Sequence, residues 1–261
     1  MEEYLKVALR ATLKAGEFLL KNFGKVTLKE AEEKKANDFV SFVDREAERI
    51  IKEYVLEVFP DHDFLGEEEG GPKEGKEFIW VVDPLDGTKN FLHGIDAFAI
   101  SCALLVNSEV EVGVVHLPAK GITYSAIRGK GAWKNGDVIR IDDKSRVEQT
   151  LFATAFPFRD KSKFHLMQLI FQKLYFAFSD VRRIGSAAYD LCLTAEGVFS
   201  VFYEYGLSVW DIAAGSLIVE EAGGVVIDFD GSRNFLSTGN IIAGRADAVK
   251  IVQDTIKEFW K

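Results

Sequence analysis

Two aspartates three residues apart, Asp83 and Asp86, form the most informative short pattern in this sequence. Proline stands between them and glycine follows, so the chain must turn there and both carboxylates can converge on one point. Hard cations such as Mg²⁺ bind oxygen ligands and keep several waters. The Leu85 carbonyl lies between the two aspartates and can supply a third oxygen. The pattern is therefore suited to a divalent-cation site at this turn.

The next two residues, Gly87 and Thr88, add features that suit phosphate chemistry. Glycine lets a phosphate approach the backbone closely, and the threonine hydroxyl can orient a water molecule. The same string is also typical of an ordinary turn, because Asp, Pro and Gly all favour turns. Taken alone, the segment leaves both interpretations open.

Two further acidic positions are ambiguous when each is considered by itself. Glu67 belongs to a run of three glutamates, 67–69, in a glycine-rich loop, and such a run indicates a solvated acidic surface. Asp211 stands where an apolar helical run begins, which indicates a helix N-cap. The small residues 213–215 would let that helix approach another element closely. Spacing alone joins neither residue to the turn.

The N-terminal elements that must help to position these residues follow from hydrophobic spacing. Apolar residues at helical intervals predict a helix over 2–23, which Gly24 ends. Residues 25–43 are charged and irregular, and we expect a β-ribbon or a mobile loop. Asp44 is predicted to cap a second helix over about 45–58.

The middle of the chain is predicted to form a sheet. The apolar run 78–82 has the length of a strand, and Pro84 and Gly87 are predicted to end it, so that the aspartates follow the strand. Strand-like runs then predict a largely antiparallel sheet over 83–140, with a hairpin at the Asn-Gly dipeptide 135–136.

After about residue 150, strands and helices alternate, which is typical of helices packed on a mixed sheet. The predicted elements are strand 151–155, helix 164–175, strand 181–184, helix 186–195, strand 198–203, helix 211–222, strand 224–228, strand 240–243 and helix 246–259. No linker separates the halves. We therefore expect one compact unit: an N-terminal α+β subdomain over 1–150 with the metal-binding turn, and a C-terminal α/β subdomain over 151–261 that closes a cleft.

Composition narrows the class of protein. The 261 residues are 48% hydrophobic and 28% charged, as in a globular protein, and no apolar run reaches the ~18 residues of a transmembrane helix. The acidic start is unlike a signal peptide, so we expect a cytoplasmic location and no membrane partner. The net charge of −9 makes nucleic acid an unfavourable partner. The four scattered histidines and two cysteines lack the spacing of a zinc site.

Taken together and in this order, the acidic segments resemble the inositol monophosphatase family. The resemblance rests on GEE at 66–68, WVVDPLDGTKNF at 80–91 and WDIAAG at 210–215, with RRIGSAA at 182–188 and EEAGG at 220–224 as further landmarks. It extends from about residue 4 to about residue 258. The implied fold is a layered αβαβα sandwich of the sugar-phosphatase type, in the α+β or α/β class.

The resemblance implies magnesium ligands drawn from three distant segments. They are Glu67, Asp83, the Leu85 carbonyl, Asp86 and Asp211. Two or three Mg²⁺ ions held there would activate a water molecule and stabilise the leaving oxygen. Glu67 and Thr88 are implied to position the attacking water. Asp44 matches the position that hydrogen-bonds the threonine, although a helix cap explains Asp44 equally well.

The resemblance also implies a substrate site. Its residues are Asp86, Gly87, Thr88, Arg183, Gly185, Ser186, Ala187, Glu204 and Asp211. The amides of Gly87 and Thr88 would bind phosphate oxygens, and Arg183 would add positive charge near a polyol or a second phosphate. Lys34 or Lys35 matches a lysine of the family's mobile segment, but a solvated charge explains either lysine better.

The implied activity is Mg²⁺-dependent hydrolysis of a phosphate monoester, foremost inositol 1-phosphate. Fructose-1,6-bisphosphatase, or an enzyme with both activities, is the alternative. Asn90, followed by Phe91, favours the inositol branch, since Glu is expected in place of Asn90 in nucleotide phosphatases. A different class, a non-catalytic protein that regulates RNA or transcription, is also considered. The expected partners are a small phosphorylated metabolite and a second copy of the chain in a homodimer.

Overall fold

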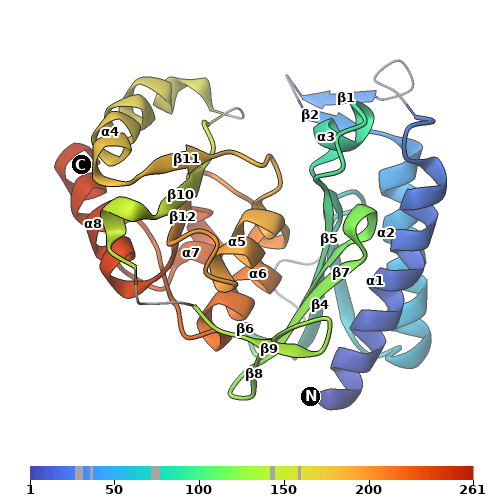
Figure 1. Ribbon diagram of the computed structural model, residues 1–261. Helices are drawn as coiled ribbons and strands as arrows, with labels where there is room; N and C mark the ends of the chain where they lie inside the picture. Colours follow the sequence, from blue (N-terminus) through green and yellow to red (C-terminus); the bar gives the residue numbers. More distant parts are fainter. Residues whose placement is uncertain (27–31, 36–37, 72–76, 142–144, 158–159, 261) are drawn as a thin grey trace.

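The computed structural model describes residues 1–26, 32–35, 38–71, 77–141, 145–157 and 160–260, and the side chains of all of these except 32–35 and 38–40. Five layers of helix and sheet follow one another across the molecule (Figure 1). The predicted αβαβα sandwich is therefore confirmed. Helices α1 (Glu2–Asn22) and α2 (Phe42–Val58) form the first layer, and α4 (Phe164–Ala177) and α8 (Ala246–Phe259) form the last.

The larger sheet has seven strands within the described ranges, in the order β3-β4-β5-β6-β7-β8-β9. Only β3 and β4 pair in parallel there. The strands are β3 (Asp63–Gly66), β4 (Phe78–Asp86), β5 (Ala99–Val106), β6 (Glu109–Leu117), β7 (Ile122–Ile127), β8 (Gly131–Lys134) and β9 (Asp137–Ile139). The hairpin predicted at 135–136 is confirmed, since β8 and β9 pair in antiparallel on either side of it. Both of its central residues have positive φ, as such a two-residue turn requires.

The smaller sheet has five described strands in the order β11-β10-β12-β14-β13. They are β10 (Leu151–Thr154), β11 (Asp180–Arg182), β12 (Val201–Glu204), β13 (Val225–Ile227) and β14 (Ile241–Gly244). A ribbon of β1 (Glu32–Lys35) and β2 (Asp38–Val40) stands apart from both sheets. The short helices are α3 (Thr88–Leu92), α7 (Phe235–Thr238) and the 3₁₀ turns Pro118–Lys120, Val147–Gln149 and Lys161–Lys163. The division into subdomains 1–150 and 151–261 stays a prediction.

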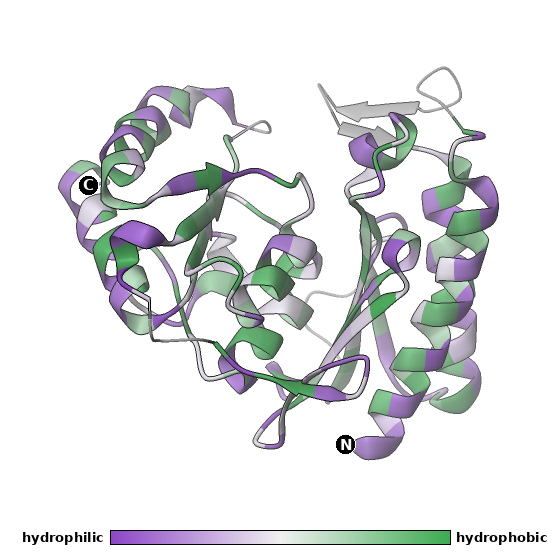
Figure 2. Cartoon of the chain, viewed as in Figure 1, coloured by the Kyte–Doolittle hydropathy of each residue, from purple (hydrophilic) through white to green (hydrophobic). Residues whose placement is uncertain are grey.

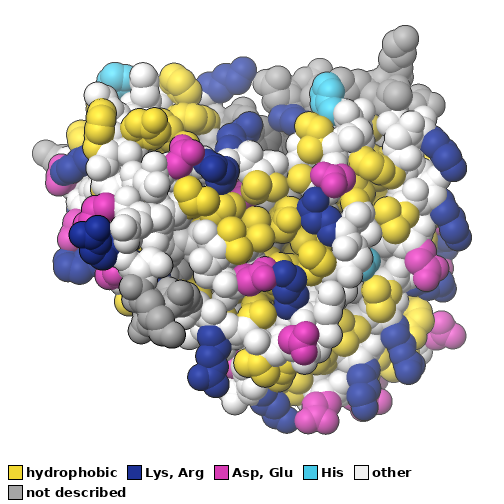
Figure 3. Space-filling model, in the orientation of Figure 1, with side chains coloured by type: hydrophobic (Ala, Val, Ile, Leu, Met, Phe, Trp, Pro, Cys, Tyr) yellow, Lys and Arg dark blue, Asp and Glu magenta, His cyan; other side chains and the backbone are white. Residues whose placement is uncertain are grey.

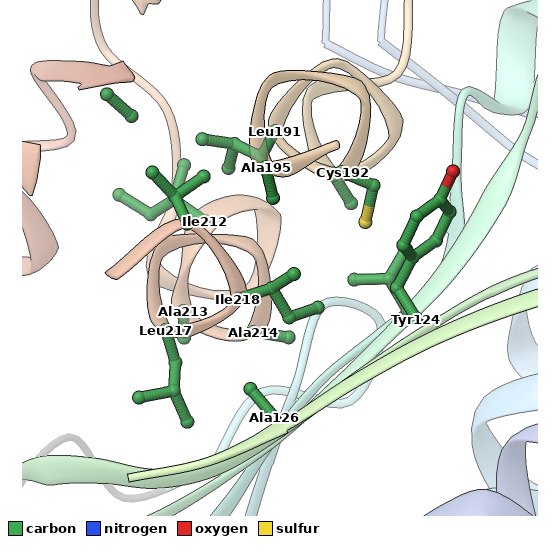
Figure 4. Packing of buried hydrophobic residues seen from close by; sticks show 14 of the residues in the cluster. Tyr124, Ala126, Leu191, Cys192, Ala195, Ile212, Ala213, Ala214, Leu217 and Ile218 are labelled. Carbon is green, nitrogen blue, oxygen red and sulfur yellow. The ribbon is translucent and has the colours of Figure 1, made fainter. Parts of the chain in front are cut away.

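The middle layer consists of α5 (Ala187–Ala195) and α6 (Val209–Glu221), which lie between the two sheets. Nine consecutive residues of α6, 211–219, are buried, so this helix has no polar face, whereas α1 and α2 alternate between hydrophilic and hydrophobic positions (Figure 2). Figure 4 shows side chains of α6, both small and large, packed between α5 and β7. A Cβ on Gly113 of β6 would lie 2.8 Å from the Ala214 carbonyl oxygen, so the close approach expected of residues 213–215 is confirmed.

Two predicted boundaries were wrong. Strand β4 continues to Asp86 instead of ending at residue 82, because its pairing with β5 is interrupted between Asp83 and Asp86, where Pro84 needs no ladder hydrogen bond. Asp44 does not cap a helix that starts at 45. Helix α2 starts at Phe42 with Ser41 as its N-cap, and Asp44 is the third helical residue.

Asp211 shows the same difference from prediction as Asp44. The N-cap of α6 is Ser208, and Asp211 occupies the third position of a capping box. Its Oδ2 accepts a hydrogen bond of 2.7 Å from the Ser208 amide. Both aspartates therefore stabilise a helix start with one oxygen, and this leaves room for a second role at the other.

Candidate active site

One cleft brings the predicted residues together. Its lining includes all the predicted metal ligands and all the predicted substrate-binding residues. It also includes five residues that were not predicted, namely Lys89, Asn90, Ala155, Asp190 and Leu207. Asp44 is not part of the lining and reaches the cleft through another side chain.

Glu67 lies beside Asp83 because β3 and β4 are in parallel register. Gly66 is opposite Val82, and the Glu67 amide donates a hydrogen bond of 3.2 Å to the Val82 carbonyl. The fully buried carboxylate of Glu48, on α2, accepts hydrogen bonds of 2.8 Å from the amides of residues 68 and 69. The acidic loop is therefore held in place and is not the plain solvated surface that its composition indicates.

Asp211 is placed near the same point by a link between β5 and α6. Ser101 of β5 pairs with Asp83 in the sheet register. The Ser101 hydroxyl donates a hydrogen bond of 2.9 Å to the carbonyl of Trp210, the residue before Asp211. The start of α6 is thus tied to the strand next to the acidic turn.

Asp86 is oriented from the opposite side by the start of α5. Its Oδ2 accepts hydrogen bonds from the Ser186 hydroxyl at 2.8 Å and from the Ala188 amide at 2.7 Å. The positive end of a helix favours a carboxylate there. Gly87 follows with φ of 96°, and a Cβ at this position would lie 3.0 Å from the Ala97 carbonyl oxygen, so both the backbone angle and the close approach require glycine.

The four carboxylates interact electrostatically. Asp83 is 1% exposed, and burial raises the pKa of its carboxyl group well above the usual range. Three neighbouring carboxylates raise this pKa further and belong, in decreasing order of effect, to Glu67, Asp86 and Asp211. Such a cluster is unfavourable unless protons or cations neutralise it.

The donor set fits a hard divalent cation. All the donors are oxygens, including the Leu85 carbonyl, and Mg²⁺ binds carboxylate and carbonyl oxygens together with water. In the described ranges, no three His, Cys, Asp or Glu side chains are drawn closely enough around one point to hold an ion as they stand. Repulsion between like charges opposes such an approach, so binding would require a small closure of these side chains around the cation.

Thr88 connects the cleft to Asp44. Its hydroxyl lies 3.0 Å from Asp44 Oδ1 and 3.0 Å from the Leu85 carbonyl oxygen, so it donates its single proton to one of these acceptors. Asp44 is 1% exposed, and its Oδ2 accepts hydrogen bonds from the amide and hydroxyl of Ser41. Burial raises the Asp44 pKa, and these hydrogen bonds partly oppose the shift. The threonine oxygen keeps lone pairs that can accept a hydrogen bond from water.

The predicted substrate-binding residues from the C-terminal half all line the cleft. Glu204 stands at the end of β12 and is 6% exposed. Arg183 lines the cleft, whereas the neighbouring Arg182 pairs with Asp180 at the surface. The side chains of Lys34 and Lys35 lie outside the described part of the chain.

Asn90 was considered only as a mark of substrate preference, and the structure gives it a positional role. Its side-chain amide donates hydrogen bonds to the carbonyls of Ala97 at 2.6 Å and Ile184 at 2.9 Å. It therefore joins the acidic turn to the segment before α5. A carboxylate has no proton to donate, so Glu could not make these bonds. Glu48 and Asp190 carried no local sequence signal, because only tertiary packing brings them to the site.

Comparisons with known proteins agree with this arrangement. Residues 1–260 match the inositol monophosphatase family. The Nus factor SuhB of Pseudomonas aeruginosa is 40% identical over 262 residues, covering 98% of this chain and 97% of the relative. The fructose-1,6-bisphosphatase/inositol-1-monophosphatase of Aquifex aeolicus is 42% identical over 225 residues, covering 86% of this chain and 85% of the relative.

Solved structures show the same fold. The extragenic suppressor protein SuhB of Bartonella henselae superimposes with a TM-score of 0.93 at 35% identity, covering 98% of this chain and 99% of that one. An IMPase of Thermotoga maritima gives a TM-score of 0.87 at 32% identity, covering 98% of this chain and 99% of that one.

This chain belongs to the inositol monophosphatase family. Members of this family are generally metal-dependent, and membership supports a phosphatase activity. No helix in the described ranges is both long and apolar enough to span a membrane.

Proposed function

We propose that this protein hydrolyses a phosphate monoester, foremost inositol 1-phosphate, to the free alcohol and phosphate with Mg²⁺ as cofactor. The observation that carries the proposal is that carboxylates from three distant segments, Glu67, the 83–86 turn and Asp211, line one cleft beside the Thr88–Asp44 hydrogen bond. Two or three bound Mg²⁺ ions would supply an activated water and charge neutralisation for the phosphate and the leaving oxygen.

The side chains of this protein would then position the reactants. Thr88 donates its proton to Asp44, so its oxygen accepts a hydrogen bond from the attacking water and directs a water lone pair towards phosphorus. The Glu67 carboxylate removes a proton from that water. The Gly87 and Thr88 amides bind phosphate oxygens. The Glu204 carboxylate accepts hydrogen bonds from hydroxyl groups of the alcohol. As the bond between phosphorus and the ester oxygen breaks, that oxygen leaves with the bonding electrons and takes up a proton from solvent water to give the free alcohol.

A substrate panel tests the proposal. Inositol 1-phosphate, fructose 1,6-bisphosphate and adenosine 3′,5′-bisphosphate are compared with saturating Mg²⁺ and with EDTA. We expect the highest kcat/KM with inositol 1-phosphate and no turnover in EDTA. A preference for fructose 1,6-bisphosphate would support the alternative of a bisphosphatase or an enzyme with both activities. The Aquifex relative, whose name gives both activities, supports the same alternative.

A non-catalytic role in transcription is the second candidate, because several relatives at about the same identity are named Nus factor SuhB. The net charge of −9 is unfavourable for direct RNA binding. Absence of turnover on every ester of the panel, with a shift of RNA on a gel, would favour this candidate.

We further propose a homodimer, which is supported by the hydrophobic side chains that gather in the middle of the face in Figure 3.

Thr88→Ala is expected to lower kcat by about 10²- to 10⁴-fold, the usual range for a group that positions a proton transfer. Mg²⁺ affinity should change little, because the threonine is not among the proposed ligands. Thr88→Ser keeps the hydroxyl and should retain most of the activity. Steady-state kinetics with a Mg²⁺ titration would measure kcat and the Mg²⁺ affinity of each variant. Equal losses in the Ala and Ser variants would remove the hydroxyl from this role.

A further inference from the structure

Asp190 is a buried acid in the cleft to which the proposed reaction gives no task. It lies on α5 and is 2% exposed, yet it lines the cleft together with Arg183 and Glu204. Its Oδ1 is buried and has no hydrogen-bond partner among the residues that the structure describes. Because an unpaired charged oxygen is costly in such a place, this geometry favours a carboxyl group without charge.

The surroundings of Asp190 favour the same protonation state. Burial raises the pKa of its carboxyl group well above the usual range, and the negative charges of Glu204, on β12, and Asp86, on β4, raise it further. A hydrogen bond from the Ile184 main chain and the positive charge of Arg183 oppose this shift but do not reverse it. A neutral carboxyl group can donate one hydrogen bond and still accept another.

The Ile184 main chain is held at two points. Asn90 donates a hydrogen bond of 2.9 Å to its carbonyl oxygen, and Asp190 interacts with its main chain from the α5 side. Arg183 and Gly185, the residues before and after it, both line the cleft. Asp190 is therefore linked to a segment that lines the cleft, and Glu204 lines the same cleft.

We propose that Asp190 is a positioning residue for the alcohol half of the substrate: its neutral carboxyl group donates a hydrogen bond towards the Glu204 carboxylate and holds the Ile184 main chain. The Glu204 carboxylate, so oriented, accepts hydrogen bonds from hydroxyl groups. The site so formed selects a polyhydroxylated alcohol, since a further anionic group beside Glu204 would be repelled. This inference rests on the proposed phosphatase activity.

Two variants and two substrates test the inference. Asp190→Asn keeps the shape, a donor and an acceptor, whereas Asp190→Ala removes both. We expect Asp190→Asn to stay within about threefold of the natural protein in kcat/KM for inositol 1-phosphate, and Asp190→Ala to raise KM by about tenfold or more with a smaller change in kcat. With p-nitrophenyl phosphate, which has no hydroxyl groups to recognise, both variants should stay within about threefold.

Thr194→Val is the matched control, because Thr194 is a fully buried polar residue on the same helix and its hydroxyl bonds to the Asp190 carbonyl. It should change neither substrate's kinetics. Should Asp190→Ala not fold, as judged by circular dichroism, Asp190→Leu fills a similar volume without polar atoms and replaces it.

Three results would overturn the inference. An equal loss of kcat/KM for inositol 1-phosphate in Asp190→Asn and Asp190→Ala would mean that the carboxylate charge is needed. Equal loss on both substrates would mean a purely structural role, and unchanged kinetics in Asp190→Ala would mean no role. Failure of the proposed function itself looks different, because the natural protein would then hydrolyse neither ester.

Discussion

Asp83→Asn is expected to reduce kcat/KM for the preferred phosphate ester by on the order of 10³-fold, equivalent to about 4 kcal/mol of transition-state stabilisation. The asparagine keeps the shape of the side chain, and its oxygen can still accept the hydrogen bond of 2.9 Å that the Leu85 amide donates to Asp83 Oδ1. The fold should therefore persist. What is lost is one negative charge at the centre of the acidic cluster, and with it the affinity for divalent cations.

The same substitution should stabilise the protein when metal is removed. Burial and three carboxylate neighbours disfavour the ionised form of Asp83, and asparagine has no charge to bury. In EDTA at neutral pH, the thermal midpoint of Asp83→Asn should lie above that of the natural protein. The rise in midpoint on adding Mg²⁺ should be smaller in the variant, since fewer ligands remain. A calorimetric or fluorescence melt with and without Mg²⁺ measures both effects.

Asp228→Asn is the matched control for Asp83→Asn. Asp228 is also a buried carboxylate, 3% exposed, but it does not line the cleft and is bonded to the Thr238 hydroxyl. Its substitution should leave the Mg²⁺-dependent rise in thermal midpoint intact. If Asp83→Asn kept full activity, or if both variants lost the Mg²⁺ effect equally, the acidic cluster would not be the cation site.

Parts of the site that depend on local chemistry could be predicted from the sequence. The convergence of Asp83 and Asp86 follows from the turn residues between and after them. The close packing of residues 213–215 follows from their small side chains. The position of Pro84 inside β4 was harder to predict, because a proline normally ends a central strand. Only the interrupted pairing between β4 and β5 permits it, and this interruption depends on the partner strand.

Residues that reach the site through tertiary register could not be joined by spacing. Glu67 depends on β3, a strand of four residues that hydrophobic alternation did not reveal, and on the buried Glu48 of another helix. Asp211 depends on Ser101, whose hydroxyl bonds to Trp210, the residue before Asp211 and 109 residues later in the chain. Only the family resemblance connected these segments before the structure did.

The corrected helix starts had a readable signal. A serine three residues before an acidic residue indicates a capping box, and both Ser41 with Asp44 and Ser208 with Asp211 have this spacing. The acid then lies inside the first helical turn and its carboxylate is held by the serine amide. The prediction that these aspartates are N-caps put the helix starts too late in the chain. It nevertheless placed both acids correctly at the beginning of a helix.

Added Mg²⁺ should oppose the loss of stability that the metal-free protein shows as pH rises. Burial raises the pKa of Asp44, Asp83 and Asp190. Below the unfolded pKa, both states are protonated and no stability is lost. As pH rises towards the higher folded pKa, the unfolded state releases protons that the folded state retains, so these carboxyl groups destabilise the metal-free protein. Its thermal midpoint should therefore fall between about pH 5 and about pH 7.5.

His116 acts in the opposite direction, because burial lowers its pKa and its protonation would favour unfolding at acidic pH. Comparison with Asp83→Asn removes this contribution, since both proteins contain the same histidine. In EDTA, the stability advantage of the variant should grow as pH rises. In the natural protein, cations compete with protons for the same oxygens, so the Mg²⁺-dependent rise in midpoint should be larger at about pH 7.5 than at about pH 5.

Sodium chloride at matched ionic strength distinguishes binding from screening in this experiment. Screening weakens repulsion between exposed charges but acts much less on buried ones, and Asp83 is buried. We therefore expect sodium to reproduce little of the Mg²⁺ effect at either pH. An Mg²⁺ effect that is independent of pH, or one that sodium matches, would mean that the buried carboxylates do not bind the cation. Because proton release and metal binding involve the same oxygens, activity and Mg²⁺-dependent stabilisation should rise with pH together.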